Sequence, residues 1–311
     1  MARCSISIIL TINNSGNDNI SNCLDSILSQ GAWDYEIIIV NNGSPDGYTI
    51  EICENYRTQY SQIKIIHMEQ SELTLVYNKG LDIASCRYVH FMEVSGCLEE
   101  DALVKIAPFL LESYDVIFID TTFYGRSVSW NRSHGSTLRR LIQKIPDRLW
   151  DKVIRRDLLL SENISFSDGI TWECVDFCMN LYIHAKVYGA VDFKYYRHTA
   201  ETNIDDEEMF HKVMLTISKW AGPAETVYRE YGTYIQSWMA GMYCDLLIPA
   251  YSRLSRGARR IYKPGMDDFR WLIDMDANKN RRMLGTMYSL FGLYLLSKII
   301  SVFNKNRSAG G

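Results

Sequence analysis

Several signatures are missing from this sequence of 311 residues, and each absence excludes a class of protein. The formal net charge is −4, so the charge does not favour nucleic acid as a partner. The eight cysteines form no Cys-x-x-Cys pair, and the six histidines show no metal-ligand spacing, which argues against a zinc site. We therefore expect reduced, mostly buried thiols in a cytoplasmic protein.

Long apolar runs are also missing. No run of eighteen uncharged apolar residues occurs, and the apolar run after the N-terminus is short and followed at once by polar residues. The sequence thus predicts neither a signal peptide nor a clear membrane-spanning helix.

What is present is an alternation of two patterns over the first 120 residues. Runs rich in β-branched residues predict strands at 5–12, 35–40, 63–68, 88–93 and 114–120. Helical periodicity between them predicts helices at 23–30, 49–60, 73–84 and 100–112. Such alternation is typical of parallel strands joined by crossover helices. The loops at 41–47 and 93–97 would then lie at the carboxyl edge of one sheet, where ligands bind.

The alternation fades after about residue 130. Periodicity predicts helices over 138–163, broken at Pro146, and over 173–188, followed by a short strand at 191–198. Beyond Asp205 the pattern is almost wholly helical. We therefore expect an α/β domain at 1–205 and a helical region at 206–311.

The order of these segments resembles the family-2 glycosyltransferases of the GT-A fold, which are inverting enzymes. The resemblance covers roughly residues 5–200 and is carried by SIILTINN, CLDSILSQ, YEIIIVNNGSPDG, NKGLDIA, YVHFMEVSGCLEEDAL, LWDKVIRRDLLLSENISF and KYYRH. It implies a Rossmann-like, mostly parallel sheet with flanking helices, here with a C-terminal helical extension. It also implies transfer of a sugar from a nucleotide-activated donor to a glycan or glycolipid acceptor in surface polysaccharide assembly, such as capsule or lipopolysaccharide.

The resemblance also implies site residues, carried over position by position. Glu173 stands at the first place of the family's catalytic Glu-Asp pair, and Cys174 takes the place of the Asp. Because Asp176 lies one helical turn from Glu173, either carboxylate could serve as the base. The implied donor-binding residues are Thr11, Asn13, Asn14, Asn41, Asn42, Gly43, Asn78, Glu93, Val94, Ser95, Lys152, Arg197 and His198.

The family's metal-binding Asp-x-Asp is replaced here by Glu93, Val94 and Ser95, and an Arg beside the donor is replaced by Tyr77. Mn²⁺ and Mg²⁺ prefer carboxylate ligands, so we expect a metal that is weakly bound at Glu93 or absent. These replacements leave three hypotheses. The first is a metal-weak transferase in which basic side chains stabilise the leaving group, with Lys152, Arg197 and His198 as candidates.

The second hypothesis is a changed donor. The family's base-binding loop usually carries an Asp, and Asn41 and Asn42 stand there instead. An amide can both donate and accept a hydrogen bond, so it could pair with uracil or cytosine. The sugar donor could therefore be linked to cytidine mono- or diphosphate instead of uridine diphosphate. The third hypothesis is a catalytically inactive protein that scaffolds an active transferase.

The C-terminal stretch 278–307 is apolar, interrupted by Lys298 and bounded by basic residues. This pattern predicts an interfacial helix on anionic lipid, which would place the protein peripherally at the inner face of the plasma membrane. The alternative is a helix that packs in the core or forms an oligomer.

Overall fold

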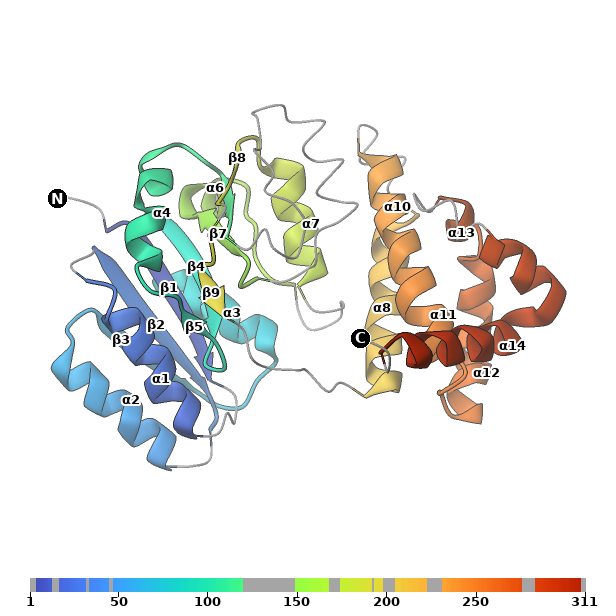
Figure 1. Ribbon diagram of the computed structural model, residues 1–311, viewed down its shortest axis with the longest axis horizontal. Coiled ribbons are helices and arrows are strands. Elements are labelled where there is room, and N and C mark those ends of the chain that lie inside the picture. The colour runs from blue at the N-terminus through green and yellow to red at the C-terminus, as the bar shows by residue number, and fades with distance from the viewer. Residues whose placement is uncertain are drawn as a thin grey trace. The chain divides into compact units, whose positions relative to one another are not determined.

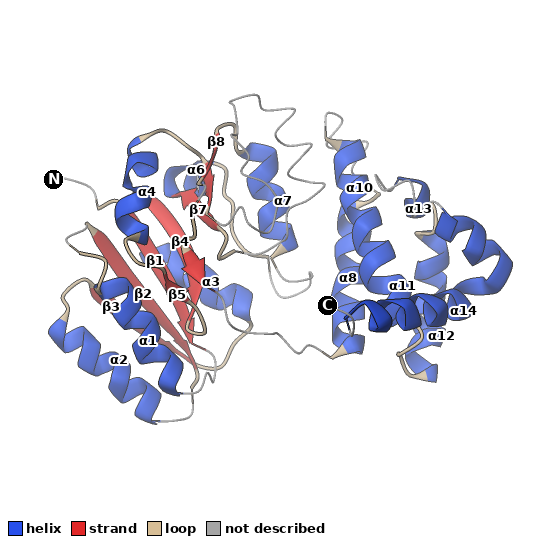
Figure 2. Ribbon diagram, viewed as in Figure 1, coloured by secondary structure: helices blue, strands red, loops and turns tan. Residues whose placement is uncertain are grey.

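The computed structural model describes residues 4–12, 17–31, 34–44, 47–119, 149–167, 174–191, 193–197, 205–222, 231–275 and 283–308. The chain forms two compact units, one α/β and one helical (Figure 1; Figure 2). The first consists of Met1–Leu138, Pro146–Gly169 and Asp176–Glu201, and the second of Arg139–Ile145, Ile170–Val175 and Thr202–Gly311.

The first unit contains a seven-stranded sheet with the strand order β3-β2-β1-β4-β7-β6-β8. Its strands are β1 (Ile6–Ile12), β2 (Tyr35–Asn42), β3 (Ile63–Met68), β4 (Tyr88–Glu93), β6 (Val116–Phe118), β7 (Lys152–Arg155) and β8 (Tyr188–Ala190). β3, β2, β1 and β4 are parallel, whereas β7 runs antiparallel between β4 and β6. β5 (Cys97–Leu98) and β9 (Tyr196–Arg197) form a separate antiparallel pair.

The helices of this unit are α1 (Asn17–Leu28), α2 (Gly47–Gln59), α3 (Leu73–Ile83), α4 (Ala102–Leu111), α6 (Arg156–Ser161) and α7 (Val175–His184). The mostly parallel α/β sheet that the sequence predicted is confirmed. The helix predicted over 173–188 ends at His184, with Tyr188 in strand β8, and the strand predicted over 191–198 is strand only at Tyr196–Arg197 among the described residues. A further segment was also predicted wrongly. Lys152–Arg155, placed in a helix by its periodicity, is strand β7, because pairing with both β4 and β6 outweighs local helical preference.

The two faces of the sheet are covered by different helices, following the period of two along each strand. Ile8 and Leu10 of β1 join one core cluster with Leu24 of α1 and Leu103 of α4. On the opposite face, a Cβ at Gly80 of α3 would collide with the side chain of Ile9. Only a glycine lets α3 approach the sheet this closely, which explains the glycine inside that helix.

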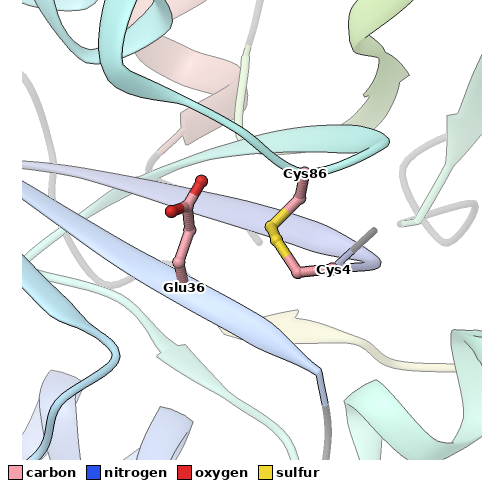
Figure 3. Close-up of side chains that lie close together, drawn as sticks. All are labelled: Cys4, Glu36 and Cys86. Atoms are coloured by element: carbon pink, nitrogen blue, oxygen red, sulfur yellow. A yellow bond between two sulfur atoms is a disulfide. The ribbon is translucent and has the colours of Figure 1, made fainter. Parts of the chain in front are cut away.

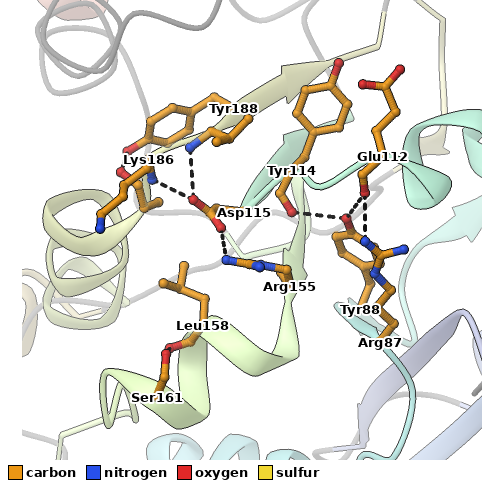
Figure 4. Close-up of polar contacts among 12 residues, drawn as sticks. Arg87, Tyr88, Glu112, Tyr114, Asp115, Arg155, Leu158, Ser161, Lys186 and Tyr188 are labelled. Atoms are coloured by element: carbon orange, nitrogen blue, oxygen red, sulfur yellow. Dashed lines mark hydrogen bonds and ion pairs between the residues drawn. The ribbon is translucent and has the colours of Figure 1, made fainter.

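A buried carboxylate joins the antiparallel part of the sheet (Figure 4). Asp115, at the start of β6, is 3% exposed and forms an ion pair with Arg155 of β7. Its other oxygen accepts hydrogen bonds from the backbone N–H groups of Lys186, at 2.6 Å, and Val187, at 2.9 Å. One carboxylate therefore ties β6 to β7 and to the chain entering β8.

The amino ends of β1 and β4 carry a disulfide between Cys4 and Cys86, whose Cα atoms lie 4.6 Å apart (Figure 3). The expectation that all cysteines are reduced thiols is therefore wrong for this pair. The parallel register brings the two positions together although 82 residues separate them in the chain. The other six cysteines are reduced thiols, and four of them are buried, as expected.

Glu36 of β2 lies beside the disulfide (Figure 3) and carries a dense set of hydrogen bonds. It accepts from Ser7 Oγ at 2.6 Å, from Lys64 Nζ at 2.6 Å and from Ser85 N at 2.6 Å. Burial alone would raise the pKa of Glu36, but the bonds from Lys64, Ser7 and Ser85 outweigh it and hold the pKa below its ordinary value. This carboxylate therefore links β1, β2, β3 and the start of β4 in its charged form.

The second unit is helical within the described residues. It comprises α8 (Asp206–Trp220), α10 (Gly232–Met242), a π-helical turn η2 (Tyr243–Leu247), α11 (Ile248–Ala250), α12 (Arg256–Asp268), α13 (Leu272–Met275) and α14 (Met283–Ser308). Asp205 caps α8 by accepting from the N–H groups of Glu207 and Glu208. The predicted helical character beyond Asp205 is confirmed.

The last helix contains the stretch Met283–Val302, which has a mean hydropathy of 1.4 and is long and apolar enough to cross a membrane. The sequence prediction, which treated Lys298 as an interruption, found no such stretch. The backbone is not helical at Gly292, where φ is 72° and ψ is 163°. α14 therefore consists of two helical segments joined at this glycine.

We predict that Glu36→Gln destabilises the protein by about 2 kcal/mol at neutral pH, because a neutral amide loses the charged bond to Lys64. The folded-state pKa is lowered, so the carboxylate stabilises the fold above the unfolded-chain pKa, and this contribution is lost as pH falls through the folded pKa. Urea unfolding of both proteins at neutral and acidic pH should show the difference shrinking in acid.

The matched control is Glu51→Gln, an exposed glutamate on α2. It should change stability by less than about 0.5 kcal/mol at either pH. Equal effects of the two substitutions at neutral pH would contradict the role assigned to Glu36.

Candidate active site

The ends of three parallel strands meet at one edge of the sheet. In the register of the central strands, Thr11 of β1 lies opposite Val40 of β2 on one side and Glu93 of β4 on the other. Asn41 follows Val40 and lies opposite Ile12. The register thus brings together Thr11, the Asn41–Asn42 loop and Glu93, which the sequence predicted as donor-binding positions.

The two asparagines at the end of β2 have defined partners in neighbouring loops. Asn42 donates to the carbonyl of Ser71 and accepts from its N–H, both at 2.8 Å. Asn41 accepts from the N–H of Ser44 at 3.1 Å, and its amide nitrogen lies 3.3 Å from Nδ1 of His67. Both side chains are buried, at 4% and 3% exposure. Their side-chain amides hold the loops at this edge in place. To bind a nucleotide base, an amide would have to give up its present hydrogen bond.

Gly43 follows in a left-handed conformation with φ of 66°. A Cβ at this position would lie 2.6 Å from the backbone nitrogen of Gln70. The loop after β2 and the loop after β3 are therefore in backbone contact, which requires glycine for both its conformation and its size.

The turn at the end of β4, which we call the corner, carries one carboxylate, and its neighbouring residues pack or bond to the backbone instead of forming a pair of metal-binding carboxylates. Val94 is 3% exposed and belongs to the core cluster. Ser95 Oγ donates to Glu93 Oε2 at 3.5 Å. The hydroxyl of Tyr196 in β9 donates to the Glu93 carbonyl at 3.2 Å and accepts from the Glu93 N–H at 3.3 Å. A tyrosine from far along the chain therefore holds the backbone of this corner.

Tyr196 also fills the space beside Gly96, where a Cβ would collide with its phenol ring. The ring packs against Trp150, with centroids 5.6 Å apart, and against His90, with centroids 6.0 Å apart. Burial raises the pKa of Tyr196, and burial lowers the pKa of His90 to about 4 despite the opposing effect of the bond to the Trp150 carbonyl. The floor of the corner is thus aromatic and uncharged at neutral pH.

The donor set at this corner does not match a dedicated site for a divalent cation. Among the described residues, the end of β4 offers one carboxylate, Glu93, and the hydroxyl of Ser95, whereas Mg²⁺ and Mn²⁺ prefer several oxygen ligands. Among the described residues, one group has metal-ligand proximity, namely Cys4, Glu36 and Cys86. That group lies at the opposite, amino end of the strands, and its cysteines are joined to each other.

Tyr77, which replaces the family's Arg, packs away from solvent at 5% exposure. Its ring belongs to an aromatic cluster with Phe91, Phe166 and Phe177, at centroid distances of 5.3 Å to Phe91 and 5.0 Å to Phe166. Asn78, the next residue, donates to the carbonyl of Phe166 and accepts from its N–H, both at 2.8 Å. The side chain of Asn78 therefore anchors the segment at 164–167 to α3.

The segment anchored by Asn78 leads to the candidate base. Ser167 Oγ donates a hydrogen bond to Asp176 Oδ2. Asp176 is 2% exposed and occupies the first turn of α7, where the helix dipole favours a negative charge. Asn78, Phe166, Ser167 and Asp176 form a chain of contacts from α3 to α7.

The other predicted residues have different surroundings. Lys152 is fully buried at the start of β7, forms an ion pair with Asp151, and lies 5.9 Å from the ring centroid of Tyr182. Arg197 is mostly exposed, with Nε 3.9 Å from a carboxylate oxygen of Glu99. The predicted residues that lie outside the described ranges are Asn13, Asn14, Glu173 and His198.

Two residues that shape this site were missed by the sequence reasoning. Tyr196 was placed in a predicted strand that helps to carry the family resemblance but was given no role, and Ser167 was not considered. The glycine at position 96 was a usable signal for Tyr196, because a glycine directly after a strand end often marks a close approach. No local pattern marked Ser167, whose partner Asp176 lies nine residues further on.

The polar residues at the carboxyl edge of the parallel strands mark the place where open α/β sheets bind ligands, and comparison with known proteins gives the family. Residues 7–169 match the model of Glycosyl transferase family 2, which covers more than half of the chain. The chain belongs to this family. Its fold is the GT-A fold, as expected.

Curated relatives and solved structures agree with this assignment. The chain is 24% identical over 220 residues to the glycosyltransferase YibD of Escherichia coli (strain K12), covering 64% of this chain and 63% of YibD. It is 24% identical over 213 residues to the cholesterol galactosyltransferase of Borreliella burgdorferi, covering 61% of this chain and 59% of the relative. The chain thus matches less than two thirds of the length of these relatives.

The structure of S. aureus TarS 1–349 in complex with UDP-GlcNAc is similar at a TM-score of 0.71. The match covers 97% of this chain and 92% of the TarS chain, at 17% identity. At this level of identity the likeness shows the fold alone.

We predict that Gly96→Ala destabilises the protein by about 1–3 kcal/mol, because the added methyl group collides with Tyr196 and forces it away from Glu93. The control is Gly47→Ala, which has open space around its Cβ and should be neutral or slightly stabilising. Thermal unfolding of the two variants measures the difference. Equal melting temperatures would show that Tyr196 is not held tightly at this corner.

Proposed function

We propose that this protein is an inverting glycosyltransferase that moves a sugar from a nucleotide diphosphate donor to a hydroxyl of a glycan or glycolipid acceptor. The observation that carries the proposal is the convergence of Thr11, the Asn41–Asn42 loop and Glu93 at one strand edge in a family-2 fold. A lipid-borne acceptor is supported by the Borreliella relative, which is named for galactosyl transfer to cholesterol, a lipid alcohol.

A uridine diphosphate sugar is the favoured donor, with a cytidine-linked donor as the alternative. The S. aureus TarS complex contains UDP-GlcNAc on a similar fold. The argument for cytidine rested on the amides of Asn41 and Asn42, and these amides are engaged with Ser44, His67 and Ser71. Base recognition by backbone groups of the same loop is compatible with either pyrimidine.

Inverting transfer needs one carboxylate to accept the proton of the acceptor hydroxyl while the hydroxyl oxygen attacks the anomeric carbon. Asp176 is a candidate because Ser167 and the first turn of α7 orient its carboxylate. Glu173 remains the second candidate. Loss of the nucleotide diphosphate develops negative charge that must be stabilised, and Arg197 is an exposed cation proposed for this purpose.

The donor set at Glu93 leads us to propose that metal contributes weakly or not at all to this step. The proposed setting is surface polysaccharide or glycolipid assembly at the cytoplasmic side of the plasma membrane. This setting rests on the family resemblance of the sequence, and the transfer reaction does not depend on it.

We predict donor-dependent nucleotide release that persists in a metal chelator. Uridine, cytidine, guanosine and thymidine nucleotides, each with and without Mn²⁺, should first be ranked by thermal shift, with a uridine nucleotide giving the largest shift. Nucleotide release from the corresponding sugars is then measured with chelator and with Mn²⁺. Loss of all release in chelator would contradict metal independence. No release with any nucleotide sugar, together with binding to another transferase, would establish a scaffold instead.

The base assignment gives a separate prediction. Asp176→Asn or Glu173→Gln should lower kcat by about 10²–10⁴-fold, because the residue that accepts the proton is lost, and donor binding should change little. Asp157→Asn, an exposed carboxylate on α6, serves as the control and should retain full activity. Full transfer activity in both test variants would refute the assignment of the base to this pair.

A further inference from the structure

The C-terminal part of α14 is fixed to the helical unit along one face. Leu293 and Leu296 are 2% and 0% exposed. Ser297 is fully buried, and its hydroxyl donates to the Pro249 carbonyl at 3.2 Å and accepts from the Ser252 N–H at 2.8 Å. These contacts with α11 and the turn after it determine which side of α14 faces outward.

The opposite side of the segment after Gly292 is apolar and exposed. We call this side, together with the exposed Phe291 at the end of the preceding segment, the outer face of α14. The exposed fractions are 49% for Phe291, 39% for Tyr294, 52% for Leu295 and 59% for Val302. Lys298 is exposed on the same face, one helical turn from both Tyr294 and Val302. A helix on the surface of a soluble unit usually places polar residues on this side, so an exposed cluster of large apolar residues indicates a binding surface.

Two cations border the aromatic residue at the centre of the outer face. Lys298 Nζ lies 4.9 Å and Arg259 Cζ lies 4.8 Å from the ring centroid of Tyr294. Arg259 of α12 is held there because its guanidinium also donates to the carbonyls of Ser252 and Leu254. Arg256 and Arg260 of α12 are also exposed.

This combination of groups matches the interface of a lipid bilayer. Leucine, valine and phenylalanine partition into the acyl boundary, and tyrosine prefers the headgroup level. Lysine and arginine side chains reach anionic phosphates while their stems remain in apolar surroundings. An apolar face bordered by several cations fits an anionic surface better than a neutral one.

The break at Gly292 favours a helix that lies on the membrane over one that crosses it. A bilayer core leaves unpaired backbone N–H and C=O groups unsatisfied at high energetic cost, so a break in a lipid-exposed spanning helix requires other protein groups or water to satisfy them. The stretch Met283–Val302 has the length and hydropathy of a span, but its helix is interrupted at Gly292. At the interface, water can satisfy the backbone groups at such a break.

We propose that the outer face of α14 docks onto an anionic lipid bilayer, with Phe291, Leu295 and Val302 entering the acyl boundary. Arg259 and Lys298 then lie at the lipid phosphates. Lipid binding by this surface does not depend on the transfer reaction, and we expect it even if the chain is catalytically inactive.

Vesicle flotation of the full chain tests the proposal, using phosphatidylcholine vesicles with and without phosphatidylglycerol. The unaltered protein should float with the anionic vesicles and much less with the neutral ones. The double variant Leu295→Gln, Val302→Gln should bind the anionic vesicles about tenfold more weakly or worse, because two side chains no longer enter the apolar boundary. Lys298→Glu should weaken binding to anionic vesicles and leave the neutral ones unaffected.

The matched control is Leu160→Gln on α6, where the leucine is 56% exposed, close to the 52% of Leu295. It should float like the unaltered protein. Equal flotation of the double variant and the unaltered protein would overturn the proposal, as would failure of the unaltered protein to float with anionic vesicles.

A second copy of the chain is the competing occupant of this face. If a second copy covers this face, light scattering without lipid gives the mass of a dimer for the unaltered protein and the mass of a monomer for the double variant. If the double variant is a monomer and still floats like the unaltered protein, the proposal is overturned. Thermal unfolding confirms that each variant is folded. Should the double variant not fold, Lys298→Glu and Val302→Gln are tested singly, with the same outcomes.

Discussion

The parallel pairing of β1 with β2 and β4 is the constraint on which the proposed site depends. Its register sets Thr11 level with Val40 and Glu93, so the loops that follow these three strands emerge at the same edge although they are distant in the chain. The same register also brings Cys4 beside Cys86 at the other end of the strands, where the carboxylate of Glu36 links four strand segments. A one-residue slip would turn side chains to the wrong face and separate all of these groups.

The chemical character of the site edge follows from what fills it. Two positions where the family resemblance implies charged groups hold residues that pack or form neutral hydrogen bonds: Tyr77 joins an aromatic cluster, and Asn42 bonds to the neighbouring loop. Val94, between Glu93 and Ser95, enters the core. The hydroxyl of Tyr196 bonds to the backbone of Glu93. Packing therefore stabilises this edge, and in the proposed transfer the charge of a leaving diphosphate would need stabilisation by other groups, such as Arg197.

Much of the fold could be predicted from the sequence because its signals are local. The β-branched runs of β1, β2 and β3 and the periodicity of α3 are contained within each segment. The strand β7 was predicted as helix because its conformation is decided by β4 and β6, which are distant in the chain. The site was less predictable for the same reason. Asn78 was placed near the donor by resemblance, while its actual partner, Phe166, lies 88 residues away.

For the C-terminal helix, the sequence leaves several kinds of helix open and the structure distinguishes between them. From the sequence, α14 is apolar on all sides, which is compatible with a core helix, a span or an interfacial helix. The buried Ser297 and its bonds to Pro249 and Ser252 decide that one face is already used within the unit. Gly292 decides that the segment is not one continuous helix. Within the described residues of the helical unit, the remaining apolar surface is exposed, and the cations around Tyr294 favour an anionic surface as its partner.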